Sequence, residues 1–217
     1  TLDNALKIIM VKSANDVSVT IAEGVGGSVE GFAAEMNAVS ARLGMTQSRW
    51  VNPNGLPDER QVTSARDMAI LARALYRDFP EHRGLWSIGA IQFGARYMAN
   101  HNGLIGRYPG ADGMKTGFTC AAGFNVVASA SRGGRRLIAV VLGAPSAGER
   151  TAKAAQLFDK GFSGGGGSDL MSIPAGGVSA APNMRGEVCV RRGRGGGWLG
   201  EDEDLNVPIA GQEAYLN

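Results

Sequence analysis

The sequence lacks several features that would assign it to a common class of protein. No apolar run approaches the roughly 18 residues that a membrane-spanning helix needs. The net charge is only +2, from 22 Lys+Arg against 20 Asp+Glu, whereas nucleic-acid-binding domains usually carry a dense basic patch. The two histidines, His82 and His101, have no carboxylate or second histidine at the spacing of metal ligands. We therefore expect no nucleic-acid partner, no metal and no other cofactor.

Cysteine is also scarce. The two cysteines, Cys120 and Cys189, are too few for a disulfide framework and are not spaced as metal ligands. Cys120 fits either a reactive thiol or a small buried side chain. Cysteine content therefore leaves the redox state of the compartment open.

Glycine, by contrast, is abundant and unevenly distributed. The 217 residues, 44% of them hydrophobic, are enough for one core and short for two. Of the 33 glycines, 13 lie in residues 163–217, where ordering the backbone costs much entropy. We expect one domain over residues 1–162, followed by a glycine-rich linker and a loosely attached tail of unknown role over 163–217. Trp198 and Tyr215 are the aromatic residues that could anchor this tail.

Residues 1–162 show helical periodicity first and strand patterns afterwards. Apolar spacing and capping residues predict helices over 2–12, 15–23, 29–43 and from 65, with Ser28 and Ser64 as N-caps and Gly44 as a stop. Residues 124–131 and 136–142 are rich in strand formers around a glycine-containing turn, and residues 148–160 return to helix. This order predicts an α+β fold with helices against an antiparallel sheet.

Two short motifs are candidates for chemistry. Ser13-Ala14-Asn15 lies where one predicted helix ends and the next begins, and Lys115-Thr116-Gly117 lies at the start of a predicted strand. Each motif alone is a weak signal. For Ser13 and Asn15, capping of a helix is the usual role at such a junction. Together they match two of the three motifs of the penicillin-recognising serine enzymes, which are S-x-x-K, S-D-N and K-T-G.

The sequence around these motifs resembles that of the D-alanyl-D-alanine carboxypeptidases, which are low-molecular-mass penicillin-binding proteins. The resemblance runs from Thr1 to about Phe162 and rests on five segments: 12–16, 51–57, 63–69, 100–104 and 110–117. It implies a β-lactamase/transpeptidase-like domain with an antiparallel sheet flanked by helices, with the N-terminal part missing. The tail does not resemble the β-rich second domain that many members carry.

The first family motif, S-x-x-K, occurs nowhere in the 217 residues, although it carries the nucleophilic serine and the basic lysine of the family. The 12 residues before Ser13 leave no room for it. Thr1 is neither an initiator methionine nor part of a signal peptide, so the start looks like a cut inside a longer protein. We expect that the sequence begins downstream of the catalytic serine and that this chain alone is inactive; the other option is that a second polypeptide supplies the motif.

The resemblance implies a serine-type carboxypeptidase that trims the terminal D-alanine of peptidoglycan stem peptides through an acyl-enzyme and is inhibited by β-lactam antibiotics. Its substrate places it in the bacterial periplasm or cell envelope. Ser13 would pass a proton toward the departing D-alanine nitrogen. Asn15 would hold the amide carbonyl of the substrate, and Lys115 would supply a fixed positive charge.

Four more residues are implied in substrate binding. Thr116 would offer a hydroxyl to the terminal carboxylate, and Gly117 would leave room for the substrate to lie along the strand. The N–H of Phe118 would form the oxyanion hole together with the N–H of the nucleophile. Arg150 resembles an arginine that binds the carboxylate of the substrate in some members, although a helix-surface arginine is an equal alternative.

Two other functions remain open on the sequence alone. A class A-like β-lactamase shares the fold and both motifs, but it needs a deacylating glutamate in E-x-x-L-N, a pattern that the segment from Glu59 to Thr63 does not match. A non-catalytic peptidoglycan-binding domain would explain the absent S-x-x-K without any upstream segment.

Overall fold

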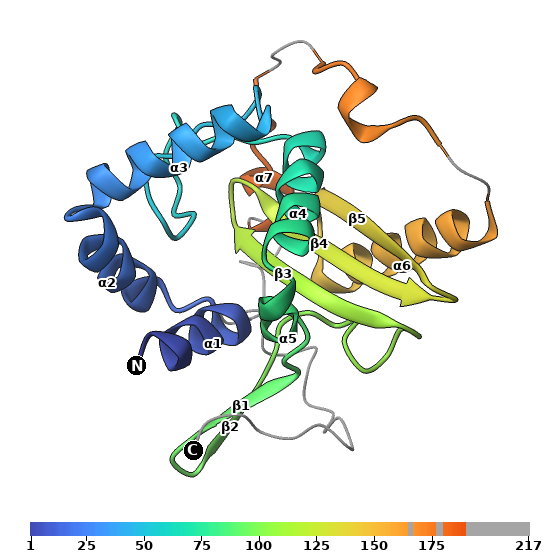
Figure 1. The fold of residues 1–217 in the computed structure, drawn as a ribbon, viewed down its shortest axis with the longest axis horizontal. Helices are drawn as coiled ribbons and strands as arrows, with labels where there is room; N and C mark the ends of the chain where they lie inside the picture. Colours follow the sequence, from blue (N-terminus) through green and yellow to red (C-terminus); the bar gives the residue numbers. More distant parts are fainter. Residues whose placement is uncertain (165–166, 177–179, 190–217) are drawn as a thin grey trace.

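A three-stranded antiparallel sheet with helices on both faces forms the centre of the molecule (Figure 1). The computed structural model describes residues 1–164, 167–176 and 180–189, so Trp198 and Tyr215 lie outside the described residues. The strands are β3 (Ala111–Thr119), β4 (Gly123–Arg132) and β5 (Arg135–Ala144), in the order β3-β4-β5. The predicted hairpin and the third strand are thereby confirmed.

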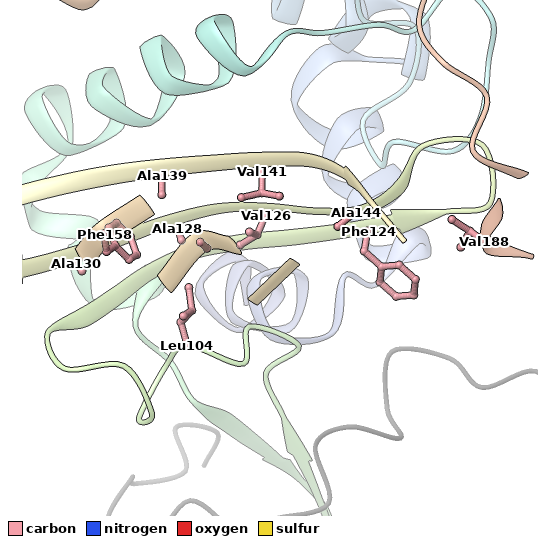
Figure 2. Packing of buried hydrophobic residues seen from close by; sticks show 11 residues of the cluster. Leu104, Phe124, Val126, Ala128, Ala130, Ala139, Val141, Ala144, Phe158 and Val188 are labelled. Atoms are coloured by element: carbon pink, nitrogen blue, oxygen red, sulfur yellow. The ribbon is translucent and has the colours of Figure 1, made fainter. Parts of the chain in front are cut away.

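The two faces of the sheet pack against different helices. Alternate residues of β4 from Phe124 to Ala130 face α6 (Ala147–Ser163), whose Phe158 is fully buried in the largest apolar cluster (Figure 2). Val127 points to the other face and packs with Ala72 of α4 (Ala65–Asp78). The period of two along β4 therefore divides the core into two layers.

The N-terminal helices α1 (Leu2–Lys12), α2 (Asn15–Gly26) and α3 (Val29–Leu43) follow one another at the edge of the molecule in Figure 1. The Ser28 side chain caps α3 by accepting a hydrogen bond from the Gly31 N–H at 3.0 Å. Gly44 ends the same helix in the left-handed conformation, with φ +78°. These bounds confirm the predicted start and stop.

Several smaller elements lie outside the sequence expectations. After α4 come a 3-10 turn (Pro80–His82) and the short α5 (Arg83–Trp86), and then a hairpin of β1 (Ala90–Phe93) and β2 (Arg96–Ala99). The tail contributes a 3-10 turn (Leu170–Ser172) and α7 (Arg185–Val188). No helix in the described ranges is both long and apolar enough to cross a bilayer.

The described parts of the tail are attached to the domain, in contrast to the expectation of a loosely attached segment. Arg66 Nε donates to the Ile173 carbonyl at 2.8 Å, and Gln47 Nε2 donates to the Gly176 carbonyl at 2.7 Å. Cys120 and Cys189 form a disulfide. The sequence offered a reactive thiol or a small buried side chain for Cys120, and this bond excludes the reactive thiol. Sequence composition could not reveal the pairing, because 69 residues separate the two positions.

The buried carboxylate of Asp67 joins the start of α4 to the preceding loop. One carboxylate oxygen accepts hydrogen bonds from the Gln47 N–H at 2.7 Å and the Ser48 hydroxyl at 2.9 Å, and the other accepts from Arg66 at 3.2 Å. The side chain is fully buried, so these donors have little access to water as a substitute.

We therefore expect Asp67→Ala to lower the free energy of unfolding by about 2–3 kcal/mol, because buried donors lose their acceptor. Urea denaturation monitored by circular dichroism measures the change. Asp67→Asn is the matched control and should lose less, since its remaining oxygen can still accept. An alanine variant as stable as the wild type would show that the network contributes nothing.

Candidate active site

Ser13 lies between α1 and α2 in an unusual backbone conformation. Its φ of +54° makes it the one non-glycine residue in the left-handed region among the residues that the structure describes. The Ser13 N–H still bonds to the Ile9 carbonyl at 3.0 Å, so the residue ends α1 as its C-cap. This conformation costs a side-chain-bearing residue about 1–2 kcal/mol. Residues held in such regions cluster at functional sites.

The side chains of Ser13 and Lys115 are hydrogen-bonded to each other. Lys115 Nζ also donates to the Thr116 carbonyl at 2.6 Å, which keeps the half-buried ammonium at the edge of β3. The S-x-N and K-T-G motifs, which the sequence analysis identified as a pair, therefore face each other within hydrogen-bond reach. Two segments 102 residues apart thus meet at one point.

The free edge of β3 lies beside this pair. In the described sheet β3 has β4 as a neighbour on one side, and the Gly117 carbonyl accepts from Asn125 on β4 at 3.3 Å. Successive residues of a strand direct their peptide groups to opposite edges. The N–H of Phe118 therefore points away from β4, to the edge where the Thr116 carbonyl binds Lys115.

The side chains of the K-T-G segment divide between the two faces of the sheet. Lys115 pairs with Val127 in register and shares the face that α4 covers, and a Cβ on Gly117 would meet nothing within 4 Å on that side. Thr116 is 6% exposed and lies on the opposite face, as does Phe118, whose ring packs on Phe124 at 4.3 Å. The space beside Gly117 is thus open, whereas Thr116 is mostly covered.

Asn15 and Arg150 differ sharply in accessibility. Asn15 is exposed in the first turn of α2, two residues from Ser13. Arg150, on α6, is only 2% exposed and donates to the carbonyls of His101 at 2.9 Å and Asn125 at 3.5 Å. This burial favours a positioning role for Arg150 over direct contact with a substrate.

Arg150 binds a buried polar turn formed by residues 100–102. Asn100 Nδ2 donates to the Ile88 carbonyl at 2.8 Å, and Asn102 Nδ2 donates to the Gly113 carbonyl at 2.9 Å. Asn102 therefore fixes the start of β3, two residues before Lys115. Its part in positioning the site did not follow from the sequence, where the two asparagines around His101 were the available signal.

The fold and this pair of motifs define the class as a transpeptidase-like domain of the penicillin-binding proteins. The structure is similar to penicillin-binding protein D2 of Listeria monocytogenes in its ampicillin-bound form, with a TM-score of 0.69 and 30% identity over 75% of this chain and 68% of that one. A sequence profile described as D-alanyl-D-alanine carboxypeptidase matches residues 1–146. The chain belongs to the D-alanyl-D-alanine carboxypeptidase family.

Curated relatives are similar at the same level. The D-alanyl-D-alanine carboxypeptidase DacA of Haemophilus influenzae is 39% identical over 156 residues, which cover 71% of this chain and 40% of the relative. DacF of Bacillus subtilis is 39% identical over 167 residues, which cover 75% of this chain and 43% of the relative. The chain thus spans less than half the length of these two relatives.

Proposed function

We propose that the complete protein containing this chain is a serine-type D-Ala-D-Ala carboxypeptidase that removes the terminal D-alanine from peptidoglycan stem peptides. The observation that carries the proposal is the hydrogen bond between Ser13 and Lys115, which joins the S-x-N and K-T-G motifs at the free edge of β3. Neither residue serves as the nucleophile of the family. We infer that an S-x-x-K segment upstream of Thr1 supplies the catalytic serine and lysine.

In this mechanism the upstream serine attacks the carbonyl of the penultimate D-alanine, and D-alanine leaves as its nitrogen takes up a proton. The Ser13 hydroxyl suits the relay of that proton, because one hydroxyl both donates and accepts. The outward N–H of Phe118 stabilises the oxyanion. Water then hydrolyses the ester. Asn15, exposed next to Ser13, is free to hold the amide carbonyl of the substrate.

The substrate carboxylate needs a positive partner. Lys115 lies at the free edge of β3 and supplies charge there, while the open space beside Gly117 lets a peptide lie along the strand. The proposed hydroxyl contact from Thr116 would depend on the small exposed part of its side chain, because Thr116 is only 6% exposed. Arg150 would act indirectly, by holding the backbone of the site. β-Lactams carry the same acceptor carbonyl and carboxylate, so we expect them to acylate the same serine.

A location outside the cytosol fits this substrate. The disulfide between Cys120 and Cys189 supports it, because disulfides persist in oxidising compartments such as the periplasm. We propose the periplasm or another part of the bacterial cell envelope.

We expect penicillin to leave no covalent adduct on the 217-residue chain, because the oxyanion hole has no nucleophile to serve. The complete protein with its S-x-x-K segment should gain the mass of one penicillin and should release D-alanine from a D-Ala-D-Ala peptide. Intact-mass spectrometry and a D-alanine assay measure the two results.

Each other outcome has a distinct meaning. An adduct on the 217-residue chain would contradict the need for an upstream serine. Rapid turnover of penicillin without D-alanine release would identify a β-lactamase. A complete protein that binds stem peptides but neither acylates nor turns over would identify a binding domain.

A further inference from the structure

The tail of the chain returns to the end of the strand that carries K-T-G. Cys120 directly follows β3, two residues beyond Phe118, and its disulfide partner Cys189 directly follows α7. The two Cα atoms are 5.7 Å apart. The Met184 N–H, just before α7, donates to the Ala121 carbonyl at 2.9 Å. One covalent bond and one backbone hydrogen bond therefore join α7 to the turn between β3 and β4.

Packing makes a second connection between α7 and the site. Val188 is 2% exposed and belongs to the same apolar cluster as Phe124, beside which Figure 2 shows it. Met184 and Phe118 both pack against this cluster. Phe118 is thus linked to α7 through the backbone of Cys120 and through the ring of Phe124.

Within the β3–β4 hairpin itself, Asn125 Nδ2 donates to the Gly117 carbonyl at 3.3 Å and to the Gly123 carbonyl at 2.9 Å. The Ala122 N–H bonds to Thr119 Oγ1 at 3.0 Å, and Gly123 adopts a φ of +71°. Because β3 is an edge strand in the described sheet, its end has one neighbouring strand to hold it. Strand ends with few partners open more readily than central strands.

Resting on the proposed function, we propose that α7 and the Cys120–Cys189 disulfide are a positioning element that holds the Phe118 N–H in place as an oxyanion donor. An oxyanion donor acts only within a narrow range of distance from the developing charge. Loss of this positioning element therefore slows the acylation step and leaves the initial noncovalent binding of the ligand nearly unchanged. Cys120 and Cys189 are positioning residues in this scheme, since neither touches the substrate.

The first test uses hydrogen–deuterium exchange on the chain itself, with the disulfide intact or reduced by a phosphine. Exchange in residues 117–124 should become about threefold or more faster on reduction, because this turn opens locally. Residues 129–137, at the opposite end of the β4–β5 hairpin, are the internal control and should keep their rate. Equal exchange of 117–124 in both forms would overturn the proposal, as would a rise of similar size in 129–137, which indicates global loosening.

The second test uses the complete protein with Cys120→Ala/Cys189→Ala, which removes the bond without leaving a thiol. The first-order acylation step with penicillin should slow about tenfold, since small misplacements of catalytic groups have effects of this order or larger. The dissociation constant of the noncovalent complex should stay within about twofold. Val188→Ala, which keeps the disulfide but weakens the packing of α7, should change the same step in the same direction.

Glu187→Ala, on the exposed side of α7, is the matched control and should acylate as the wild type does. All rates are measured well below the thermal midpoint of each variant. A double alanine variant that acylates within about threefold of the wild type would overturn the positioning role, and so would a loss confined to noncovalent binding. If the oxidised wild type failed to acylate at all, the proposed function would fail with it, whereas the exchange result would still decide whether α7 holds the turn.

Discussion

Replacing Lys115 with alanine is expected to slow acylation of the complete protein by penicillin about 100- to 1000-fold, which corresponds to about 2.7–4 kcal/mol of lost transition-state stabilisation. The ammonium is half-buried, bound to Ser13 and to the Thr116 carbonyl, at the edge where a carboxylate would dock. A pre-placed charge in such a site needs no reorganisation during the reaction, so its loss acts mainly on the rate.

Stability should change much less. Lys115 is not a member of the buried apolar clusters that the structure describes, so thermal unfolding of Lys115→Ala serves as the control for folding. Lys153→Ala, which removes an exposed lysine on α6, is the matched control for charge and should leave the acylation rate unchanged. A Lys115→Ala enzyme that acylates within about threefold of the wild type would remove Lys115 from the site.

Local signals were sufficient to predict much of the fold. The ends of α3 depend on Ser28 and Gly44, and the start of α4 depends on Ser64, so each signal acts over three or four residues. The β4–β5 hairpin follows from strand formers around a short glycine turn in the same way. The β1–β2 hairpin carries the same kind of signal at Gly94, but its strands of four residues are too short to show a clear period.

Burial within a helix was predicted less well, because it depends on distant segments. Val39 of α3 lies at a position where apolar spacing alone would favour the core, yet it is 38% exposed. The buried positions are instead Ala33 and Ser40, and the Ser40 hydroxyl accepts a hydrogen bond from the Trp50 indole at 2.7 Å. The loop after α3 folds back over this face, and hydrophobic periodicity carries no information about such a path.

The site could be predicted only in part, because several of its contacts also depend on segments that are distant in the sequence. The family resemblance placed Ser13 and Lys115 together, and the structure brings them into contact. The positions of Thr116 and Arg150 depend on which face of the sheet α6 covers, and the role of Asn102 depends on the carbonyl of Gly113. Those facts arise from strand pairing and helix packing, which no short motif encodes.

Ser13 offers a way to separate chemistry from stability. Ser13→Gly should slow acylation of the complete protein about 100-fold or more, because the proton relay loses its hydroxyl. The free energy of unfolding should change by less than about 1 kcal/mol, because glycine tolerates the φ of +54° and this gain offsets the lost hydrogen bond to Lys115. Penicillin acylation kinetics and urea denaturation measure the two quantities.

Ser13→Ala is the matched variant, because it removes the same hydroxyl but keeps a Cβ in the left-handed conformation. It should acylate as slowly as Ser13→Gly and should be less stable than that variant by about 1 kcal/mol. The strained backbone would then have no catalytic effect by itself, and the hydroxyl that it directs toward Lys115 would account for the whole loss of rate. A Ser13→Gly enzyme that acylates within about threefold of the wild type would contradict the relay, whereas a rapid alanine variant beside a slow glycine variant would assign the effect to backbone rigidity instead.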